Sequence, residues 1–248
     1  MMKIADYLDS TYLKTPKQAG LSDSETLKKV RELTHEAIEH EIYAVMVRPD
    51  YVHSLRMLLD ELHANVKLGT VIDFPEGRNS VKEKIEEAQK ALANGADELD
   101  FVVDYTAFKN GNLEKVKEEI ESCSRLVLNA DKAIKWIIET AALSQDQIAQ
   151  ITALIRDIAL ENLSEFSPEN IFVKSSTGFY ATPEGTPNGA TPEVIQCMIE
   201  NAGPLPVKAS GGVRSKEEAE RMIGLGVKRI GTSSALAIAT GKIAKTDY

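Results

Sequence analysis

Residues 191–234, TPEVIQCMIENAGPLPVKASGGVRSKEEAERMIGLGVKRIGTSS, contain two consecutive helix–strand units. Each unit ends in a short apolar stretch typical of a strand, PVKAS (206–210) and KRIGTSS (228–234). Both preceding helices have start and stop signals, namely a capping Thr191 before Pro192, a Ser215–Glu218 capping box, and the helix-ending glycines Gly203 and Gly226. Strands alternating with helices predict a parallel sheet.

The same alternation runs back through the rest of the chain. Five more strand-like segments are YAVMV (43–47), KLGTVI (67–72), ELDFVVD (98–104), AIKWIIET (133–140) and NIFVKSS (170–176). A shorter extended piece around residues 7–11 would supply an eighth strand. Eight such strands predict a single (β/α)8 TIM barrel, class α/β, over residues 1–248. An open doubly wound sheet is the alternative, but it usually has a glycine-rich turn after its first strand, and this sequence has none.

Composition excludes several classes of protein. The formal net charge is -9 and the pI is about 5.1, so we expect no nucleic-acid partner and no binding to anionic membranes. No apolar run has the length of a signal peptide or a transmembrane helix. The two cysteines, Cys123 and Cys197, lie far apart in helical contexts and are expected to be free thiols. These features predict a cytoplasmic protein.

Three ionisable residues stand out within the apolar strands: Asp100, Lys174 and Lys208. Side chains alternate along a strand, so Lys174 can face the barrel interior while Ile171 and Val173 face the helices. The same alternation places Asp100 inside. We therefore predict that two lysines and one aspartate meet near the barrel axis.

This combination suits imine chemistry. A lysine is a nucleophile only without its proton, and both burial and a second ammonium disfavour the charged form. Lys208 would thus make Lys174 a neutral amine that condenses with a carbonyl, and Asp100 would shuttle protons. The alternative is a structural ion pair between Asp100 and one lysine, with the other lysine facing solvent.

Glycines and hydroxyls cluster after the last three strands. Glycine lets the backbone approach an anion, and the final strands of a barrel often form a phosphate site. The clusters are Ser176-Thr177-Gly178, Ser210-Gly211-Gly212 and Gly231-Thr232-Ser233-Ser234. Simple turn formation is the alternative, but the three clusters together favour a phosphate site.

Metal ligands are not evident. The four histidines, His35, His40, His53 and His63, lie in helix-like stretches without the spacing of a metal motif. We expect no metal and no cofactor.

Longer motifs resemble deoxyribose-phosphate aldolases, which are class I, Schiff-base aldolases. The resemblance spans nearly the whole chain through LDSTYL, AVMV, TVIDFPEG, ELDFVVD, IIETA, FVKSSTGF, KASGGVR and GTSSALAI. It implies reversible cleavage of 2-deoxy-D-ribose 5-phosphate to acetaldehyde and D-glyceraldehyde 3-phosphate in nucleoside catabolism. The partners it implies are a phosphorylated sugar and aldehydes, and a homo-oligomer is possible.

The resemblance also implies roles for single residues. Lys174 matches the imine-forming lysine, Lys208 the lysine that lowers its pKa, and Asp100 the aspartate that works with an ordered water. The matching substrate and phosphate residues are Asp9 and Thr11 at the end of the first strand, Gly178, Gly211, Gly212, Ser233 and Ser234.

The chain departs from some relatives at three places. Met46 stands where some have cysteine, Phe179 stands where some have a lysine after STG, and the loop 181–190 is longer than in many. The tail, residues 241–248, is expected to be mobile and ends in Tyr248. Some of the aldolases that the chain resembles also end in a tyrosine, which is thought to assist proton transfer at the enamine carbon; the alternative is a passive end.

Two other functions remain open. One is a different lysine-imine barrel, a 2-keto-3-deoxy-sugar acid aldolase or a transaldolase; a substrate carboxylate would require an arginine such as Arg78 or Arg214. The other is a phosphosugar-binding protein without catalysis, because the fold alone does not decide function.

Overall fold

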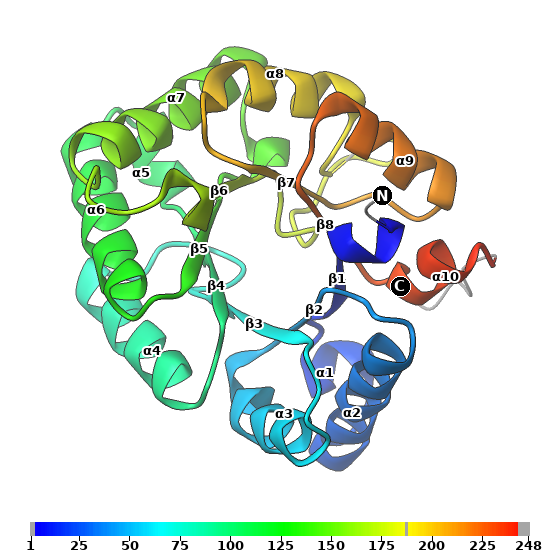
Figure 1. The fold of residues 1–248 in the computed structure, drawn as a ribbon. Helices are drawn as coiled ribbons and strands as arrows, with labels where there is room; N and C mark the ends of the chain where they lie inside the picture. The colour runs from blue at the N-terminus through cyan, green and yellow to red at the C-terminus, as the bar shows by residue number, and fades with distance from the viewer. Residues whose placement is uncertain (1–2, 187, 243–248) are drawn as a thin grey trace.

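The computed structural model describes residues 3–186 and 188–242, and its sheet is a closed barrel. Every strand runs parallel to both neighbours, in sequence order around the ring (Figure 1). The strands are β1 (Leu8–Tyr12), β2 (Ala44–Val47), β3 (Lys67–Ile72), β4 (Glu98–Val102), β5 (Ala133–Ile137), β6 (Ile171–Lys174), β7 (Val207–Ser210) and β8 (Arg229–Thr232).

Helices surround this ring on the outside (Figure 1). They are α1 (Pro16–Ala19), α2 (Asp23–Glu39), α3 (Pro49–Glu61), α4 (Val81–Ala93), α5 (Tyr105–Lys109), α6 (Leu113–Asn129), α7 (Gln145–Glu161), α8 (Pro192–Ala202), α9 (Lys216–Leu225) and α10 (Ala235–Thr240), with single 3-10 turns at Ile4–Tyr7, Thr140–Ala142 and Pro168–Asn170. Among the described residues, no helix combines the length and apolarity that a membrane crossing requires.

The predicted (β/α)8 barrel is confirmed. The eighth strand, expected at residues 7–11, is β1, and it closes the ring because Asp9 lies opposite both Ala44 of β2 and Gly231 of β8. An open sheet would have left β1 or β8 as an edge, so that alternative is wrong.

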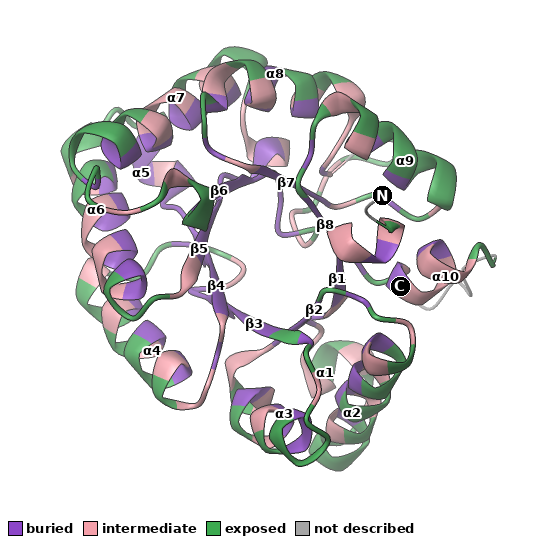
Figure 2. Ribbon diagram, in the orientation of Figure 1, coloured by how far each residue is buried: buried purple, intermediate pink, exposed green. Residues whose placement is uncertain are grey.

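Each strand has two different faces. Ile171 and Val173 of β6, like Leu99 and Phe101 of β4, pack in the large apolar core between the strands and the helices. Nearly all residues of the strands are buried, as the mostly purple strands in Figure 2 show, and Lys67 at the start of β3 is exposed. The side chains that alternate with these apolar residues therefore point into a closed interior, where the charged residues lie.

Local signals explain where the helices begin and end. The predicted Ser215–Glu218 capping box is present, and two more helices begin in the same way, with Ser80 and Glu83 and with Ser144 and Gln147. In each box the cap hydroxyl accepts a hydrogen bond from the backbone N–H three residues later. Gly226 ends α9 with a φ of 112°, a conformation that L side chains rarely adopt.

Helix α4 holds a buried charge that its apolar pattern did not predict. Lys84 is fully buried and forms ion pairs with Glu119 of α6 and with Asp73, the latter at 3.2 Å. Its ammonium also donates to the carbonyl oxygens of Gly77 (3.0 Å) and Val102 (2.7 Å). Lys84 therefore ties α4 and α6 to the carboxyl-terminal ends of β3 and β4.

Candidate active site

The three residues predicted to meet do so inside the barrel. Lys174 ends β6 and lies directly opposite Lys208 of β7 in the strand register. The Nζ atoms of Lys174 and Lys208 lie 2.9 and 2.8 Å from the same Oδ2 of Asp100. All three side chains are buried. A purely structural ion pair between Asp100 and one lysine would have left the other lysine facing solvent, and neither lysine does.

Four further charged residues belong to the same interior cluster, and the prediction of only three ionisable groups in the strands is wrong. Lys135 of β5 lies 2.9 Å from Asp100 and 2.7 Å from Glu98 of β4. Arg229 of β8 donates to both oxygens of Glu98 at 3.0 and 2.9 Å, and through Nε to Asp9 at 2.7 Å. Period-2 alternation could have found Lys135, since it lies between the outward-facing Ile134 and Trp136.

Asp9 was expected at the end of the first strand. It is instead the second residue of β1, fully buried, and its Oδ2 lies 2.5 Å from Nζ of Lys208. Thr11 donates its hydroxyl hydrogen to the backbone carbonyl of Asp9 at 2.9 Å and is partly exposed. Asp9 therefore acts on Lys208 from within the barrel, and only Thr11 lies nearer its open end.

The surroundings of Lys174 lower its pKa. Burial, opposed by Asp100 and assisted by the neighbouring ammonium of Lys208, lowers the pKa of Lys174 to about 8. Burial would raise the pKa of Asp100, but Lys135, Lys174 and Lys208 together hold it well below its usual range. A substantial fraction of Lys174 is thus uncharged near neutral pH, beside an ionised carboxylate.

A strained glutamate fixes the turn after Lys174. Glu139 has a φ of 53°, which is rare for a side chain other than glycine, and it is buried. Its carboxyl group receives hydrogen bonds from the backbone N–H and the hydroxyl of Thr177, and its Oε1 lies 2.8 Å from Oγ of Ser176. Ser176 Oγ also lies 2.6 Å from the carbonyl oxygen of Asn188.

Ser176 has one hydroxyl hydrogen, which it cannot donate both to Oε1 of Glu139 and to the carbonyl oxygen of Asn188. If Glu139 is a carboxylic acid, its O–H donates to Ser176, and Ser176 donates to Asn188. Burial raises the pKa of Glu139, against the hydrogen bonds from Thr177 and Ser176, which agrees with the protonated form. Sequence reasoning missed this residue, although IIETA was among its motifs.

The candidate phosphate residues occupy the turns after β6, β7 and β8. Gly178, Gly211 and Gly212 have φ values of 76°, 85° and 89°, and Gly178 and Gly212 have open space where a side chain would begin. Ser233 is exposed and Ser234 half-buried at the start of α10. Strands β6, β7 and β8 are adjacent and parallel, so all five residues lie at the same end of the barrel as Lys174, which ends β6.

The end of loop 181–190, whose role the sequence left open, packs on the turn after β7 through Gly189 and Ala190. The amide of Ala190 donates to the carbonyl of Gly211 at 2.9 Å. A side chain at Gly189 would lie 2.6 Å from the carbonyl oxygens of Ser210 and Gly211, so only glycine permits this approach. The loop therefore braces the turn that carries Gly211 and Gly212.

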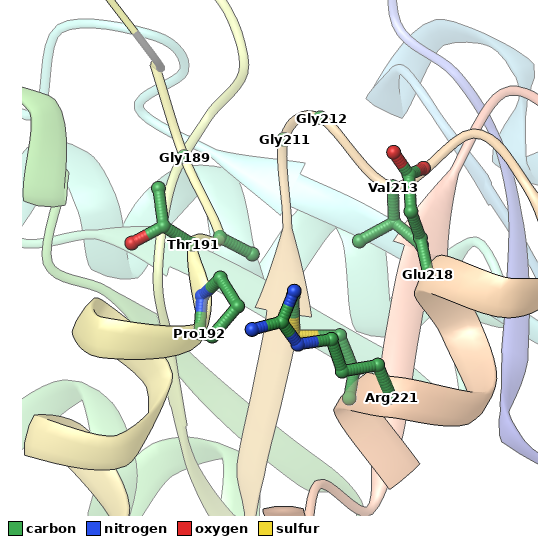
Figure 3. A pocket seen from close by; sticks show the side chains of 10 residues that line it. Gly189, Thr191, Pro192, Gly211, Gly212, Val213, Glu218 and Arg221 are labelled. Atoms are coloured by element: carbon green, nitrogen blue, oxygen red, sulfur yellow. The ribbon is translucent and has the colours of Figure 1, made fainter.

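A cavity of about 250 Å³ lies behind that turn, between α8 and α9. Figure 3 shows Thr191 and Pro192 on one side of it, and Glu218 and Arg221 on the other. Gly211 and Gly212 contribute to its wall, but none of the interior charges does. It is therefore separate from the space around Lys174.

Known proteins are similar to this chain in sequence and in fold. The model of the DeoC/LacD family aldolases matches residues 7–241. The chain is 38% identical to deoxyribose-phosphate aldolase of Thermococcus gammatolerans, over 97% of this chain and 96% of the relative. The same protein of Clostridium perfringens is 36% identical, over 99% and 98%. A solved tetrameric deoxyribose phosphate aldolase from Aeropyrum pernix has a TM-score of 0.77 and 30% identity, over 96% of this chain and 90% of that one.

The chain belongs to the DeoC/LacD aldolase family.

In this aldolase an apolar cluster lies in the barrel interior beside the charges. It consists of Leu13, Met46 and Val71, against which Phe74 and Phe179 pack. The rings of Phe74 and Phe179 meet edge to face at 5.1 Å. Met46 and Phe179, two of the three departures noted in the sequence, therefore lie in one apolar wall.

Tyr248 and most of the expected tail, 241–248, lie outside the described residues. Within the described part of the chain, no group of three His, Cys, Asp or Glu residues could hold a metal ion.

Proposed function

We propose that this aldolase reversibly cleaves 2-deoxy-D-ribose 5-phosphate to acetaldehyde and D-glyceraldehyde 3-phosphate through a Schiff base on Lys174. The relatives named deoxyribose-phosphate aldolase support the substrate, since they align over nearly the whole chain. The observation that carries the proposal is the buried amine of Lys174, with its pKa near 8, held against Asp100 beside Lys208.

The reaction follows from these positions. The neutral amine of Lys174 adds to the aldehyde carbon C1 of the open-chain sugar, and loss of water gives an iminium ion. Removal of the proton from the C3 hydroxyl then breaks the C2–C3 bond, and the electron pair moves into the iminium to form an enamine. Glyceraldehyde 3-phosphate leaves.

The second half returns the enzyme to its starting state. A proton is added to the enamine carbon, and water hydrolyses the resulting acetaldehyde imine. Asp100, acting through a water molecule, is the proposed proton carrier, and Tyr248 the proposed assistant at the enamine carbon. We assign the phosphate to Gly178, Gly211, Gly212, Ser233 and Ser234. For the rest of the sugar we assign a contact to Thr11, and an indirect effect to Asp9, which acts through Lys208.

Borohydride trapping tests this function. Acetaldehyde with borohydride should add an ethyl group to one lysine, and peptide mapping should find it on Lys174. Lys174→Arg keeps a cation but cannot form the imine, so it should lose both the adduct and turnover. Pyruvate is the control donor for the alternative aldolases. An adduct on a different lysine, or trapping of pyruvate in preference to acetaldehyde, contradicts the proposal.

We also propose that this aldolase is a homo-oligomer and lies in the cytoplasm. A tetrameric relative supports a homo-oligomer, which the molar mass in solution tests. Cys123 and Cys197 are buried free thiols, in keeping with a cytoplasmic location.

A further inference from the structure

Six charged side chains inside the barrel form a closed ring of alternating sign. Each member touches the next one: Asp9 to Lys208 (2.5 Å), Lys208 to Asp100 (2.8 Å), Asp100 to Lys135 (2.9 Å), Lys135 to Glu98 (2.7 Å), Glu98 to Arg229 (2.9 Å), and Arg229 to Asp9 (2.7 Å). The members come from strands β1, β4, β5, β7 and β8, so the ring exists only because the barrel closes. All six are buried.

The ring is electrically balanced without Lys174. It holds three carboxylates and three cations, each of which contacts two partners of opposite sign. Lys174 contacts Asp100 at 2.9 Å from outside the ring. A protonated Lys174 is thus a seventh charge without a carboxylate of its own.

Other groups near the cluster leave this balance unchanged. Met46 of β2 and Val71 of β3 are buried and apolar, and Lys67 at the start of β3 is exposed. Tyr43, which precedes β2, lies under the guanidinium of Arg229 at 3.7 Å, and burial raises the pKa of its phenol, so it stays neutral. Glu139 after β5 also acts electrostatically on Lys174, but it lies outside the ring and is unchanged in every variant below, so it does not reverse the sign of the expected shifts.

We infer that Glu98, Lys135 and Arg229 are positioning residues of this aldolase: by completing a neutral ring, they make the Lys174 amine the surplus cation that gives up its proton. This inference rests on the proposed function, since it concerns the same imine-forming lysine. A charge removed anywhere in the ring should change the protonation of Lys174, even where the altered residue lies two contacts away. The sign of the effect should follow the sign of the charge that is removed.

A merely structural ring predicts something different. Buried ion pairs are poor evidence for stability, and breaking one usually costs several kcal/mol of folding free energy. Such damage would lower activity at every pH. It would not move a pH profile in opposite directions for the loss of an acid and the loss of a base.

The experiment measures borohydride trapping of acetaldehyde as a function of pH in the intact protein. Glu98→Gln leaves the ring with one excess positive charge, so half-maximal trapping should move to lower pH. Arg229→Gln leaves one excess negative charge, so it should move to higher pH. Each shift should be about one pH unit, the size expected for one charge across this interior at an effective dielectric constant near 20.

Two further variants serve as controls. The double variant Glu98→Gln/Arg229→Gln restores the charge balance and should trap at the wild-type pH. Glu119→Gln removes a carboxylate that is equally buried but lies outside the barrel, in the Lys84 cluster, and it should leave the profile in place. Should a single variant fail to fold, the double variant and Lys135→Met, expected to shift the profile upward like Arg229→Gln, carry the test.

The outcomes separate the two proposals. Wild-type protein that traps no acetaldehyde on Lys174 refutes the proposed function. Wild-type protein that does trap it, with single variants that shift in the same direction or not at all, refutes only the ring. A double variant whose profile differs from wild type by as much as the single variants also overturns the inference.

Discussion

Replacing Lys208 by methionine tests the coupling between the two lysines most directly. Both amines contact the same Asp100 oxygen, at 2.9 and 2.8 Å, so their nitrogens lie at most about 5.7 Å apart. At that separation and an effective dielectric constant near 20, two like charges repel by about 3 kcal/mol, or roughly two pKa units. Lys208→Met removes this repulsion, and it also removes the second cation that contacts Oδ2 of Asp100, so Asp100 stabilises the protonated Lys174 more strongly.

The expected result is a large loss of the reactive amine. The pKa of Lys174 should rise from about 8 toward about 10. At pH 7.5 its uncharged fraction would fall from about a quarter to about 0.3%, and imine formation would slow by nearly two orders of magnitude. Raising the pH toward 10 should restore much of the rate.

The assay is the pH dependence of acetaldehyde trapping, and Lys208→Arg is the matched control. Arginine keeps the positive charge, so its profile should stay near that of wild type even if its different shape lowers the maximum. If Lys208→Met folds and its profile coincides with that of wild type, Lys208 does not set the pKa of Lys174. If its rate falls equally at all pH values, Lys208 acts by another route.

Further predictions concern single positions. In Gly231→Ala the new methyl group would lie 2.8 Å from Oγ of Ser210 and 3.1 Å from Cε of Lys208, so kcat should fall by about tenfold while the circular dichroism spectrum is unchanged. Ser234→Asp should raise KM for deoxyribose 5-phosphate by about tenfold and alter kcat/KM for unphosphorylated deoxyribose much less, whereas equal losses would point to general damage. Deleting Tyr248 should leave trapping intact and slow exchange of the acetaldehyde methyl protons with solvent; unchanged exchange makes it a passive end. Folding raises the pKa of Glu139, so the stability that its proton provides is lost as the pH rises through the pKa of the folded state. In urea unfolding, the free energy of unfolding of Glu139→Gln should therefore match that of wild type near pH 4 and be higher by about 1 kcal/mol at pH 8.

The fold was largely readable from local signals. Capping boxes and helix-ending glycines fix where each helix begins and ends, and they depend on residues only three or four positions apart. The apolar strand runs are similarly local. Closure through β1 was harder to predict, because its sequence, LDSTY, has polar residues on its inner face. Of the eight strand segments it is the least like an ordinary apolar strand.

The site was readable only in part, for a reason of distance along the chain. Lys174 and Lys208 are unusual in their strands and were found by alternation alone. Arg229 bonds to Asp9 across 220 residues and to Glu98 across 131, and no local pattern predicts such contacts. The pairing of Asp100 with Lys135 follows from strand register, which can be assigned only once the barrel is known.

A neutral ring would assist the proposed reaction at a second step. The iminium ion formed on Lys174 carries the same charge in nearly the same place as the ammonium, so the surroundings that disfavour one disfavour the other. The enamine that forms when the C2–C3 bond breaks carries no charge at nitrogen. Relative to the iminium, cleavage is therefore favoured by the same balance that frees the amine. Arg229→Gln should then slow carbon–carbon cleavage in single turnovers even at a pH where Lys174 is fully deprotonated.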